Sequence, residues 1–375
     1  MSKRVLILTI TAGQGHNSTA KAICKCLESE GASTQTLDVG YYYSKLVGHT
    51  IEDGYILSVE NAKHLYRRVY RHLEQRPTGR ASLMRLANRM ICRKLRKYID
   101  NYDPDVIICT HVFPAMILQA INRTRPIQAH MIGILTDFAF HPYWEESTCL
   151  DEVIVTGDML IPLALRKGYR AAQIRPLGIP INPRFSETVS QAEAKERMGL
   201  SAELPVVLVM GGSMGYGHMT KTVETLDRAA SEFQIVVVCG SNEEMKKKVD
   251  ELCTRKPIVT FGFTTEIPTL MDAATVIVTK PGGLTSSEAL AKGLPMIIVN
   301  PIPGQEERNA EYLLNLGAAM QANDMFTVDL LVDALLNDPE RLRAMQRAAK
   351  ALGKPDATVD LCRCALSSCR HAIVQ

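Results

Sequence analysis

The chain has 375 residues, of which 46% are apolar and 22% charged, as in a globular protein. This composition excludes disorder, collagen and coiled coil as the main architecture. Ten cysteines are too dilute for a disulfide scaffold, and no apolar run approaches the roughly 18 residues of a membrane span. The first apolar run, residues 5–10, is too short for a secretory signal and has no cleavage site, so we expect a first strand and a cytoplasmic protein.

Short β-rich runs alternate with helical patterns along the chain. The predicted strands are residues 5–10, 106–109, 131–136, 153–156, 206–210, 235–239, 259–261, 276–279 and 296–299. Predicted helices fill the intervals, among them residues 17–29 and 114–122, and a last helix is predicted at residues 357–372. Strand–helix alternation is typical of parallel sheets with helices on both faces. We therefore predict an α/β fold.

A proline-rich passage at residues 176–183 interrupts the alternation, which then restarts. This predicts two domains with parallel sheets, residues 1–178 and 179–356. The last helix, residues 357–375, is expected to return to the first domain.

Each predicted domain opens with a strand and a Gly-rich turn, at residues 12–16 and 211–217. Ligands of open α/β sheets bind at the carboxyl ends of the strands, so we expect the two domains to face each other across a cleft.

Another turn, Lys280-Pro281-Gly282-Gly283, follows a strand and opens a helix. Free N–H groups and the helix dipole make such a turn an anion site that suits a diphosphate. The hydroxyls of Thr285 and Ser286 add donors. Glu288 lies over a turn further along and can accept hydrogen bonds from a ribose diol, as acids do in dinucleotide-binding folds. A plain tight turn is the alternative.

The segment at residues 301–309 also joins a strand to a helix. Its adjacent long polar side chains, Gln305 and Glu306, could read sugar hydroxyls at the edge of a cleft. The alternative is structural, because acidic residues are favoured in the first turn of any helix.

A strongly basic block occupies residues 63–97, with twelve Lys or Arg and one acid, which gives a net charge of +11. The whole chain carries +3, so the other residues sum to −8. The apolar spacing predicts two basic amphipathic helices with a turn between them. Such helices suit an anionic lipid surface. A solvated face whose apolar stripe packs on its own domain is the alternative. The expected membrane contacts are Arg89, Arg93, Lys94, Arg96 and Lys97.

Nucleic acid is the rival partner of this block, but no recognised binding motif accompanies the charge, and we expect none to bind. Neither a Walker A motif nor a Gly-x-Ser-x-Gly elbow occurs, which excludes ATPase and serine hydrolase chemistry. Asp103-Pro104-Asp105 precedes a strand, at the wrong end for a ligand, and is interpreted as a turn.

A cysteine-rich cluster near the C-terminus contains Cys362, Cys364, Cys369 and His371. Zinc is one interpretation. Reduced cysteines in a final helix are favoured, because Cys-x-Cys on a helix points its sulfurs to different faces and no Cys-x-x-Cys occurs. We expect no metal and no cofactor.

Four motifs together resemble a known family. They are the Gly15-His16 turn after the first strand, Thr136-Asp137 with residues 141–144, Lys280-Pro281-Gly282-Gly283 with Glu288, and residues 303–306 with Asn309. They occur in the same order in monogalactosyldiacylglycerol synthases and bacterial diacylglycerol glucosyltransferases, in glycosyltransferase family 28. The resemblance spans roughly residues 5–350. One departure is the turn at residues 11–16, where plant members carry Gly-Gly-Gly-His.

The resemblance implies a GT-B fold, a UDP-sugar donor in the C-terminal domain, diacylglycerol bound by the N-terminal domain and inversion at the anomeric carbon. It also implies peripheral membrane attachment, so we expect the protein at the inner face of the cell membrane. The expected donor-binding residues are Gly212, Ser213, Phe261, Phe263, Lys280, Gly282, Gly283, Thr285, Ser286, Glu288, Gln305, Glu306 and Asn309, with uracil near the strand end at Phe261. Gly15, His141 and Trp144 are expected on the acceptor side.

Inversion needs a general base, and His16 is the first candidate because it begins a helix at the ligand edge of the first sheet. A helix N-terminus disfavours a cation, so we expect a neutral, base-competent imidazole. Asp137 ends a different strand of the same domain and could orient the imidazole or be the base itself. The alternative is that His16 only caps its helix or contacts phosphate.

Other functions remain open at this stage. One is a UDP-N-acetylglucosamine transferase acting on a polyprenyl-linked lipid, and another is a silent UDP-sugar sensor that binds membrane or protein partners. The Trp144 segment and the Gln305-Glu306 pair favour the glycerolipid branch, and the presence of His16 argues against a silent sensor. The patterns do not separate glucose from galactose as the sugar transferred.

Overall fold

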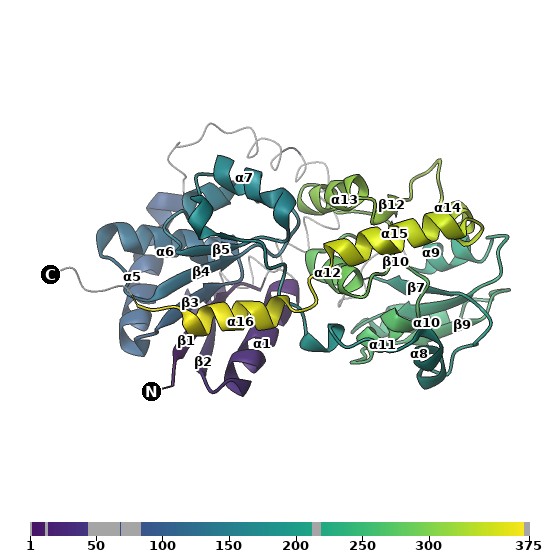
Figure 1. The fold of residues 1–375 in the computed structure, drawn as a ribbon, viewed down its shortest axis with the longest axis horizontal. Coiled ribbons are helices and arrows are strands. Elements are labelled where there is room, and N and C mark those ends of the chain that lie inside the picture. Colours follow the sequence, from purple (N-terminus) through teal and green to yellow (C-terminus); the bar gives the residue numbers. More distant parts are fainter. Residues whose placement is uncertain (1, 12–13, 44–67, 69–83, 212–218, 371–375) are drawn as a thin grey trace. The chain divides into compact units, whose positions relative to one another are not determined.

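The computed structural model describes residues 2–11, 14–43, 68, 84–211 and 219–370, with only the backbone described at residues 14 and 84–89 (Figure 1). The chain divides into two compact units. The N-terminal unit comprises residues 1–182, 303–305 and 356–375, and the C-terminal unit comprises residues 183–302 and 306–355. The junction after Asn182 lies near the expected boundary at residue 178.

The N-terminal unit is built on a six-stranded parallel sheet with the order β2-β1-β3-β4-β5-β6. Its strands are β1 (Arg4–Thr9), β2 (Ser33–Asp38), β3 (Val106–Cys109), β4 (His130–Ile134), β5 (Glu152–Ile154) and β6 (Ile174–Arg175). Its helices are α1 (Gln14–Ser29), α2 (Val39–Tyr43), α5 (Met84–Tyr102), α6 (Val112–Thr124), α7 (Ile161–Arg166) and α16 (Ala357–Ser367), with short 3-10 turns η1 (Pro142–Glu146), η2 (Asp158–Leu160) and η3 (Ala171–Gln173).

The C-terminal unit repeats this plan with the order β12-β11-β10-β7-β8-β9, again all parallel. Its strands are β7 (Val206–Met210), β8 (Gln234–Val238), β9 (Ile258–Phe261), β10 (Val276–Thr279), β11 (Met296–Ile298) and β12 (Ala319–Gln321). Its helices are α8 (Gln191–Arg197), α9 (Met219–Leu226), α10 (Glu243–Asp250), α11 (Ile267–Ala273), α12 (Gly283–Ala291), α13 (Gln305–Asn315), α14 (Val328–Leu336) and α15 (Pro339–Leu352), preceded by η4 (Pro183–Phe185).

Most strands predicted from apolar runs are buried, since parallel strands covered on both faces need apolar side chains at every position, whereas the predicted β9 is a partly exposed edge strand. Every residue of β3, β7 and β10 is buried. The strands absent from the prediction are β2, β6 and β12, which all lie at sheet edges. In β2 the sequence Ser-Thr-Gln-Thr-Leu-Asp is polar and largely exposed, so it carries no apolar signal.

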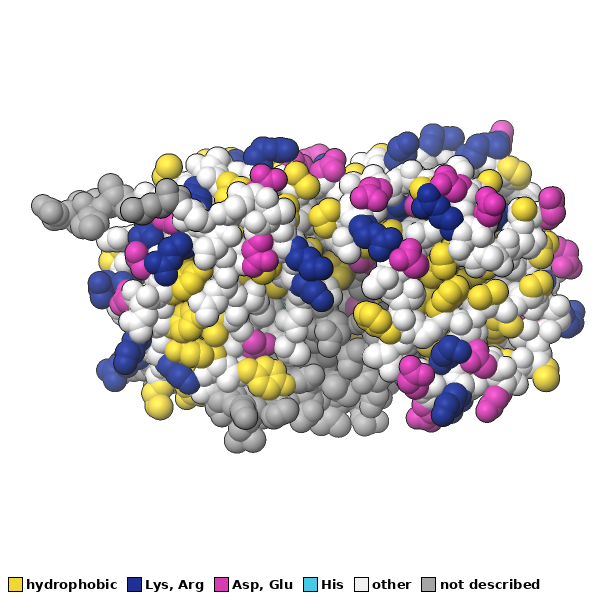
Figure 2. All heavy atoms as spheres, turned by 90° about the horizontal axis from the view of Figure 1, so that it is seen from below, with side chains coloured by type: hydrophobic (Ala, Val, Ile, Leu, Met, Phe, Trp, Pro, Cys, Tyr) yellow, Lys and Arg dark blue, Asp and Glu magenta, His cyan; other side chains and the backbone are white. Residues whose placement is uncertain are grey.

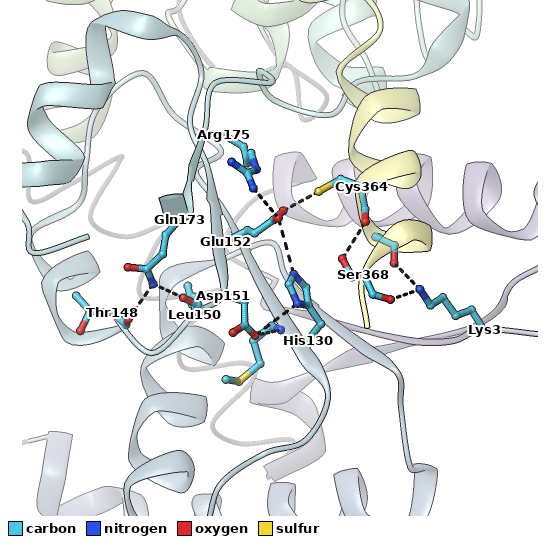
Figure 3. A network of polar contacts seen from close by, with 12 residues as sticks. Lys3, His130, Thr148, Leu150, Asp151, Glu152, Gln173, Arg175, Cys364 and Ser368 are labelled. Carbon is cyan, nitrogen blue, oxygen red and sulfur yellow. Dashed lines mark hydrogen bonds and ion pairs between the residues drawn. The ribbon is translucent and has the colours of Figure 1, made fainter. Parts of the chain in front are cut away.

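The last helix, α16, packs on α1 of the N-terminal unit, and its two cysteines have different surroundings, as predicted; Figure 3 shows Cys364. Cys362 is buried beside the carbonyl of Ile23. The thiol of Cys364 donates to Glu152 in β5, 2.6 Å away. The cysteines are free thiols, and His371 lies outside the described residues.

The network in Figure 3 extends along the amino-terminal edge of the sheet. Glu152 also pairs with Arg175 at 3.3 Å, and the Lys3 ammonium donates to carbonyls at the end of α16. Nearby, Arg370 binds Asp103 at 2.8 Å and Asp105 at 2.6 Å. The Asp-Pro-Asp turn therefore anchors the chain that follows α16.

Candidate functional site

In the N-terminal unit, polar side chains gather where β1, β3 and β4 end. His16 lies in the first turn of α1, and its Nδ1 is 2.9 Å from the carbonyl oxygen of Thr110, just after β3. The hydroxyl of Thr136, just after β4, lies 3.0 Å from the same nitrogen. A carbonyl oxygen only accepts, so Nδ1 carries the proton. In the neutral ring Nε2 then has a free lone pair and can act as a base.

Burial lowers the pKa of His16, and the hydrogen bond to the Thr110 carbonyl opposes this only in part. The imidazole is therefore neutral near pH 7, as predicted, although burial rather than the helix N-terminus is the larger cause. The side chain keeps some exposure, which a base that contacts substrate needs. Thr110 and Thr136 hold Nδ1 and thereby orient the ring, and the role of Asp137 stays a prediction.

A second histidine, His111, was absent from the predicted site. Its ring meets His16 edge-on, with centroids 4.7 Å apart. Its Nδ1 accepts from the backbone N–H of Phe113 at 3.1 Å and caps α6. Burial, and then the charges of His16 and His141, hold the pKa of His111 well below its usual value. The sequence did contain a signal for His111, because it comes two residues after the end of the buried strand β3. Thr11 and Thr136 have the same position after β1 and β4.

The residues expected on the acceptor side differ in exposure. Gly15 and His141 are partly exposed, and His141 caps η1 by accepting from Tyr143 N–H at 3.3 Å. Trp144 is only 4% exposed. A Cβ at Gly133 of β4 would lie 3.0 Å from the Trp144 ring, so the indole packs directly on the sheet. In this structure Trp144 is a core residue rather than an open contact surface, because η1 folds back over β4.

In the C-terminal unit, β10 ends at Thr279 and α12 begins at Gly283. Gly282 is the N-cap and supplies no side chain to satisfy the first N–H groups of the helix. A Cβ at Gly282 would meet nothing nearer than 4.0 Å, where Glu306 Oε1 lies, so the backbone of the turn is open to a ligand. The geometry suits an anion held by backbone N–H groups.

Behind the turn, Glu288 is buried enough to raise the pKa of its carboxyl to about 8. Burial is the only cause of this shift, and within the described residues the carboxyl has no hydrogen-bond partner. The hydroxyl of Ser286 is fully buried and also lacks a partner there. Thr285 keeps some exposure, so of the two expected hydroxyls it is the one that reaches the surface.

Three other expected donor residues brace the turn. Lys280 Nζ lies 3.5 Å from Glu306 Oε1, and Glu306 Oε2 accepts from Ile302 N–H at 2.8 Å. Asn309 is fully buried and donates to the carbonyl of Pro281 at 3.0 Å. Glu306 thus has a structural role of the kind given above as the alternative for this acid, and contact of Glu306 or Asn309 with the donor stays a prediction. Gln305 belongs to the N-terminal unit, where its amide donates to the Ala139 carbonyl at 3.1 Å.

The remaining donor residues lie further away or outside the described chain. Phe261 ends β9 and is partly exposed, and Phe263 is 76% exposed. Two strands separate β9 from β10, so Phe261 and the Gly282 turn are about 14 Å apart across three strand spacings. Gly212 and Ser213 lie outside the described residues.

Of the two basic helices predicted at residues 63–97, only the second is described, as α5. Its apolar residues Leu95 and Ile99 are 1% and 5% exposed and pack on their own unit, whereas Met90 is 69% exposed, so contact of this helix with lipid stays a prediction. Lys94 lies over the Tyr42 ring, 4.5 Å from its centroid, and Arg96 pairs with Asp100 at 2.9 Å. The first helix, with Leu65, Val69 and Leu73, and the side chain of Arg89 lie outside the described residues.

Arg93 and Lys97 are exposed on α5 and make no ion pair with the described residues. On the face shown in Figure 2, by contrast, Lys and Arg are interspersed with Asp and Glu. Within the described residues, none of the helices combines the length and the apolar character that crossing a bilayer requires.

Comparison with known proteins agrees with this layout. Residues 16–181 match the family described as monogalactosyldiacylglycerol (MGDG) synthase, and residues 206–361 match the glycosyltransferase family 28 C-terminal domain. A protein of Bacillus pumilus named processive diacylglycerol beta-glucosyltransferase is 31% identical over 94% of this chain and 91% of its own. A protein of Bacillus subtilis with the same name is 30% identical over the same shares. The crystal structure of MurG from Acinetobacter baumannii, 15% identical, superposes with a TM-score of 0.65 over 98% of this chain and 100% of its own, and it shares the GT-B fold.

Proposed function

Because this chain belongs to the glycosyltransferase family of monogalactosyldiacylglycerol synthases and bacterial diacylglycerol glucosyltransferases, we propose that it transfers a hexose from a UDP-sugar to diacylglycerol. Glycosyl transfer is the activity of the family, and the similarity covers nearly the whole chain. The names of the Bacillus relatives support the lipid acceptor. The UDP-sugar donor and inversion rest on the two sites described above.

The observation that carries the chemistry is the hydrogen bonding of His16. Nδ1–H is held by the Thr110 carbonyl, so Nε2 is the basic atom of a neutral ring. In the proposed reaction the lipid hydroxyl loses its proton to Nε2, and its oxygen forms a bond to the anomeric carbon. The bond from that carbon to the diphosphate oxygen breaks with inversion. A base with a pKa not far below neutral suits this step.

The donor is assigned to the C-terminal unit. Backbone N–H groups of the Gly282-Gly283 turn would hold the diphosphate and stabilise it as it leaves. The carboxyl of Glu288 would accept hydrogen bonds from the ribose diol. We propose no metal for this step, because the helix terminus supplies the positive potential. Full dependence of activity on added Mg²⁺ after EDTA treatment would contradict this.

The enzyme is proposed to act at a membrane surface, with residues 63–97 attracted to anionic lipid. Arg93 and Lys97 are exposed and unpaired among the described residues, so R93Q/K97Q tests the charge without disturbing Lys94 or Arg96. Lys21 and Lys25 on α1 have the same spacing and exposure, which makes K21Q/K25Q a matched control. We expect only R93Q/K97Q to weaken sedimentation with anionic vesicles, by about 1 kcal/mol per residue at low salt. Equal binding of the two variants would assign α5 a merely solvated face.

The whole proposal is tested by supplying labelled UDP-glucose, UDP-galactose or UDP-N-acetylglucosamine to the protein with diacylglycerol in liposomes. Parallel reactions contain a polyprenyl-phosphate-linked lipid instead. We expect a hexose on diacylglycerol, and mass analysis of the lipid identifies the sugar and the number added. Transfer to the polyprenyl lipid alone would establish the rival acceptor. UDP binding without transfer would indicate a sensor.

A further inference from the structure

The short helix α7 and the turn η2 before it present an outward face that is unusually apolar. Met159, Leu163 and Leu165 are 60%, 39% and 46% exposed. Pro162 is exposed as well, whereas Leu160 and Ala164 face the core at 2% and 0%. Exposed leucines are individually ordinary, but a cluster on one short element needs an explanation.

Helix geometry places these side chains around the solvent-facing half of α7. With 100° per residue and Ala164 pointing inward, Pro162 and Arg166 point away from the core. Leu163 and Leu165 each lie about 80° from that outward direction, on the two flanks of the helix, and the exposed Met159 precedes them in η2. Figure 1 shows α7 at the outside of its unit. The outward face of α7 therefore consists of apolar side chains around one arginine.

This face lies at the same sheet edge as the candidate base. The chain enters η2 from the carboxyl end of β5, and β5 is the neighbour of β4 in the sheet. The carboxyl end of β4 carries Thr136, which contacts His16. The apolar face and the acceptor-side groups thus belong to one edge of the N-terminal unit.

The charges around the face are mostly basic. Between residues 158 and 170 there are three basic residues and one acid, a net charge of +2. Arg166 and Arg170 are exposed, and Lys167 lies 3.5 Å from Glu145. Long basic side chains around apolar ones are the arrangement of elements that lie in the interface of an anionic bilayer.

A bilayer fits this face better than a second copy of the chain. A stable dimer buries about 800 Å² on each partner from roughly 20–30 residues. The outward face of α7 offers four apolar side chains, all within eight residues. Lipid imposes no minimum area of this kind, because partial insertion of a few side chains adds to attraction by charge.

We propose that residues 158–170 form a second membrane-contact surface, separate from the basic block at residues 63–97, and that Met159, Leu163 and Leu165 insert into the lipid. The proposal for this surface rests on the proposed function, since a membrane contact would bring the enzyme to its lipid acceptor. The two surfaces act differently: the basic block works through charge and the α7 face through apolar burial, which salt does not screen.

The test compares L163Q/L165Q with M325Q/L330Q by sedimentation with vesicles of phosphatidylcholine and phosphatidylglycerol. Met325 and Leu330 are exposed apolar residues of the C-terminal unit, at 75% and 52%, and serve as the matched control. We expect L163Q/L165Q to bind about 10-fold more weakly, because each leucine has less than half of its surface left to bury. The loss should persist at high salt. Equal losses in both variants, or a loss abolished by salt, would overturn the proposal.

A second measurement reports insertion directly. The single tryptophan, Trp144, is buried, so the new indole of Leu163→Trp is the exposed one. Vesicles should shift its emission to the blue, and spin-labelled lipid should quench it. Unshifted and unquenched emission would contradict insertion, as would a change from dimer to monomer in L163Q/L165Q with vesicle binding intact.

The same variants separate this inference from the proposed function. L163Q/L165Q should bind UDP and transfer sugar to a short-chain, water-soluble diacylglycerol at the unchanged rate, and lose rate only with vesicles. If the unchanged chain transfers nothing to either form of diacylglycerol, the proposed function fails instead. Unaltered transfer and binding with vesicles would refute the α7 surface alone.

Discussion

The two candidate sites occupy equivalent places, at the carboxyl ends of central strands, but their polar groups are satisfied differently. In the N-terminal unit, His16 is held by the Thr110 carbonyl and the Thr136 hydroxyl. In the C-terminal unit, the Glu288 carboxyl and the Ser286 hydroxyl have no hydrogen-bond partner among the described residues. The first site is therefore organised by the protein alone, whereas the second contains a buried hydroxyl, that of Ser286, and a partly exposed carboxyl, that of Glu288, which a ligand would satisfy.

This difference has energetic consequences. A buried polar group without a partner costs roughly 1–3 kcal/mol, which is regained when a ligand supplies the hydrogen bond. The unpaired polar groups of the C-terminal site should thus lower the free energy of unfolding of the ligand-free protein and strengthen the binding of a ligand that pairs with them. The N-terminal site should show little coupling between donor binding and its base, because the imidazole is already oriented.

Removing the base should have the largest effect. His16→Ala is expected to lower turnover by about 10²–10⁴-fold, the range for loss of general base catalysis, with little change in UDP affinity by calorimetry. In the unchanged enzyme, activity should fall on the acid side with a midpoint below about pH 6.5, because burial lowers the pKa of His16 and only the neutral ring accepts a proton. Near-normal turnover in His16→Ala, with Asp137→Asn inactive, would move the base role to Asp137.

The opposite pattern is expected in the C-terminal unit. Glu288→Ala should weaken UDP binding at pH 7 by about 0.5–1.5 kcal/mol, the range for hydrogen bonds between neutral groups, because the carboxyl keeps its proton there; calorimetry measures the difference. Glu196→Ala removes an exposed glutamate of the same unit and should leave the affinity unchanged. Equal affinities of the two variants would remove Glu288 from the donor site.

The packing behind α12 provides a stability test. A Cβ at Gly353 would lie 2.9 Å from the carbonyl carbon of Leu290 in α12, and backbone cannot swing aside. Gly353→Ala should therefore cost about 1–3 kcal/mol in the free energy of unfolding by denaturant titration. A Cβ at Gly262 would meet nothing nearer than 3.7 Å, so Gly262→Ala is the control. Equal stability of both variants would mean that α15 shifts away from α12 without cost.

The most direct test of the state of the Glu288 carboxyl concerns pH. Folded Glu288 keeps its proton up to about pH 8, whereas an unfolded glutamate loses it near pH 4.3. The folded state thus binds more protons between these values, and its stability falls as pH rises through about 8. Glu288→Gln cannot ionise, so its melting temperature without ligand should exceed that of the parent more at about pH 9 than at about pH 5. A difference independent of pH would show that the carboxyl is not desolvated.

The sequence located much of both sites because their signals are local. His16 and the Gly282-Gly283 turn each follow a buried apolar strand, and the change from strand to helical pattern marks the ligand edge. Glu288 belongs to α12, the helix that begins at this turn, so its distance from the turn follows from the sequence. The edge strands β2, β6 and β12 gave no such signal, because strands that are short or half exposed need no apolar run.

Other features depended on neighbours distant in the chain. His111 contacts His16 only because β1 and β3 pair in parallel, and the Trp144 ring covers Gly133 only because η1 folds back over β4. Likewise, the hydrogen bond that Glu306 accepts from the Ile302 N–H could not be foreseen from its position in the first turn of a helix.

By itself, the sequence determined the class of fold, the repeat of two parallel sheets, the strand ends that carry chemistry and the family. These follow from periodicity and from turn residues, which act over a few positions. Only the tertiary structure decided which nitrogen of His16 carries the proton, which residues hold it, that the pKa of Glu288 is raised, and that Leu95 and Ile99 of α5 face inward while Leu163 and Leu165 of α7 are exposed. Protonation, desolvation and exposure depend on which side chains surround a group, and packing brings those neighbours from distant parts of the chain.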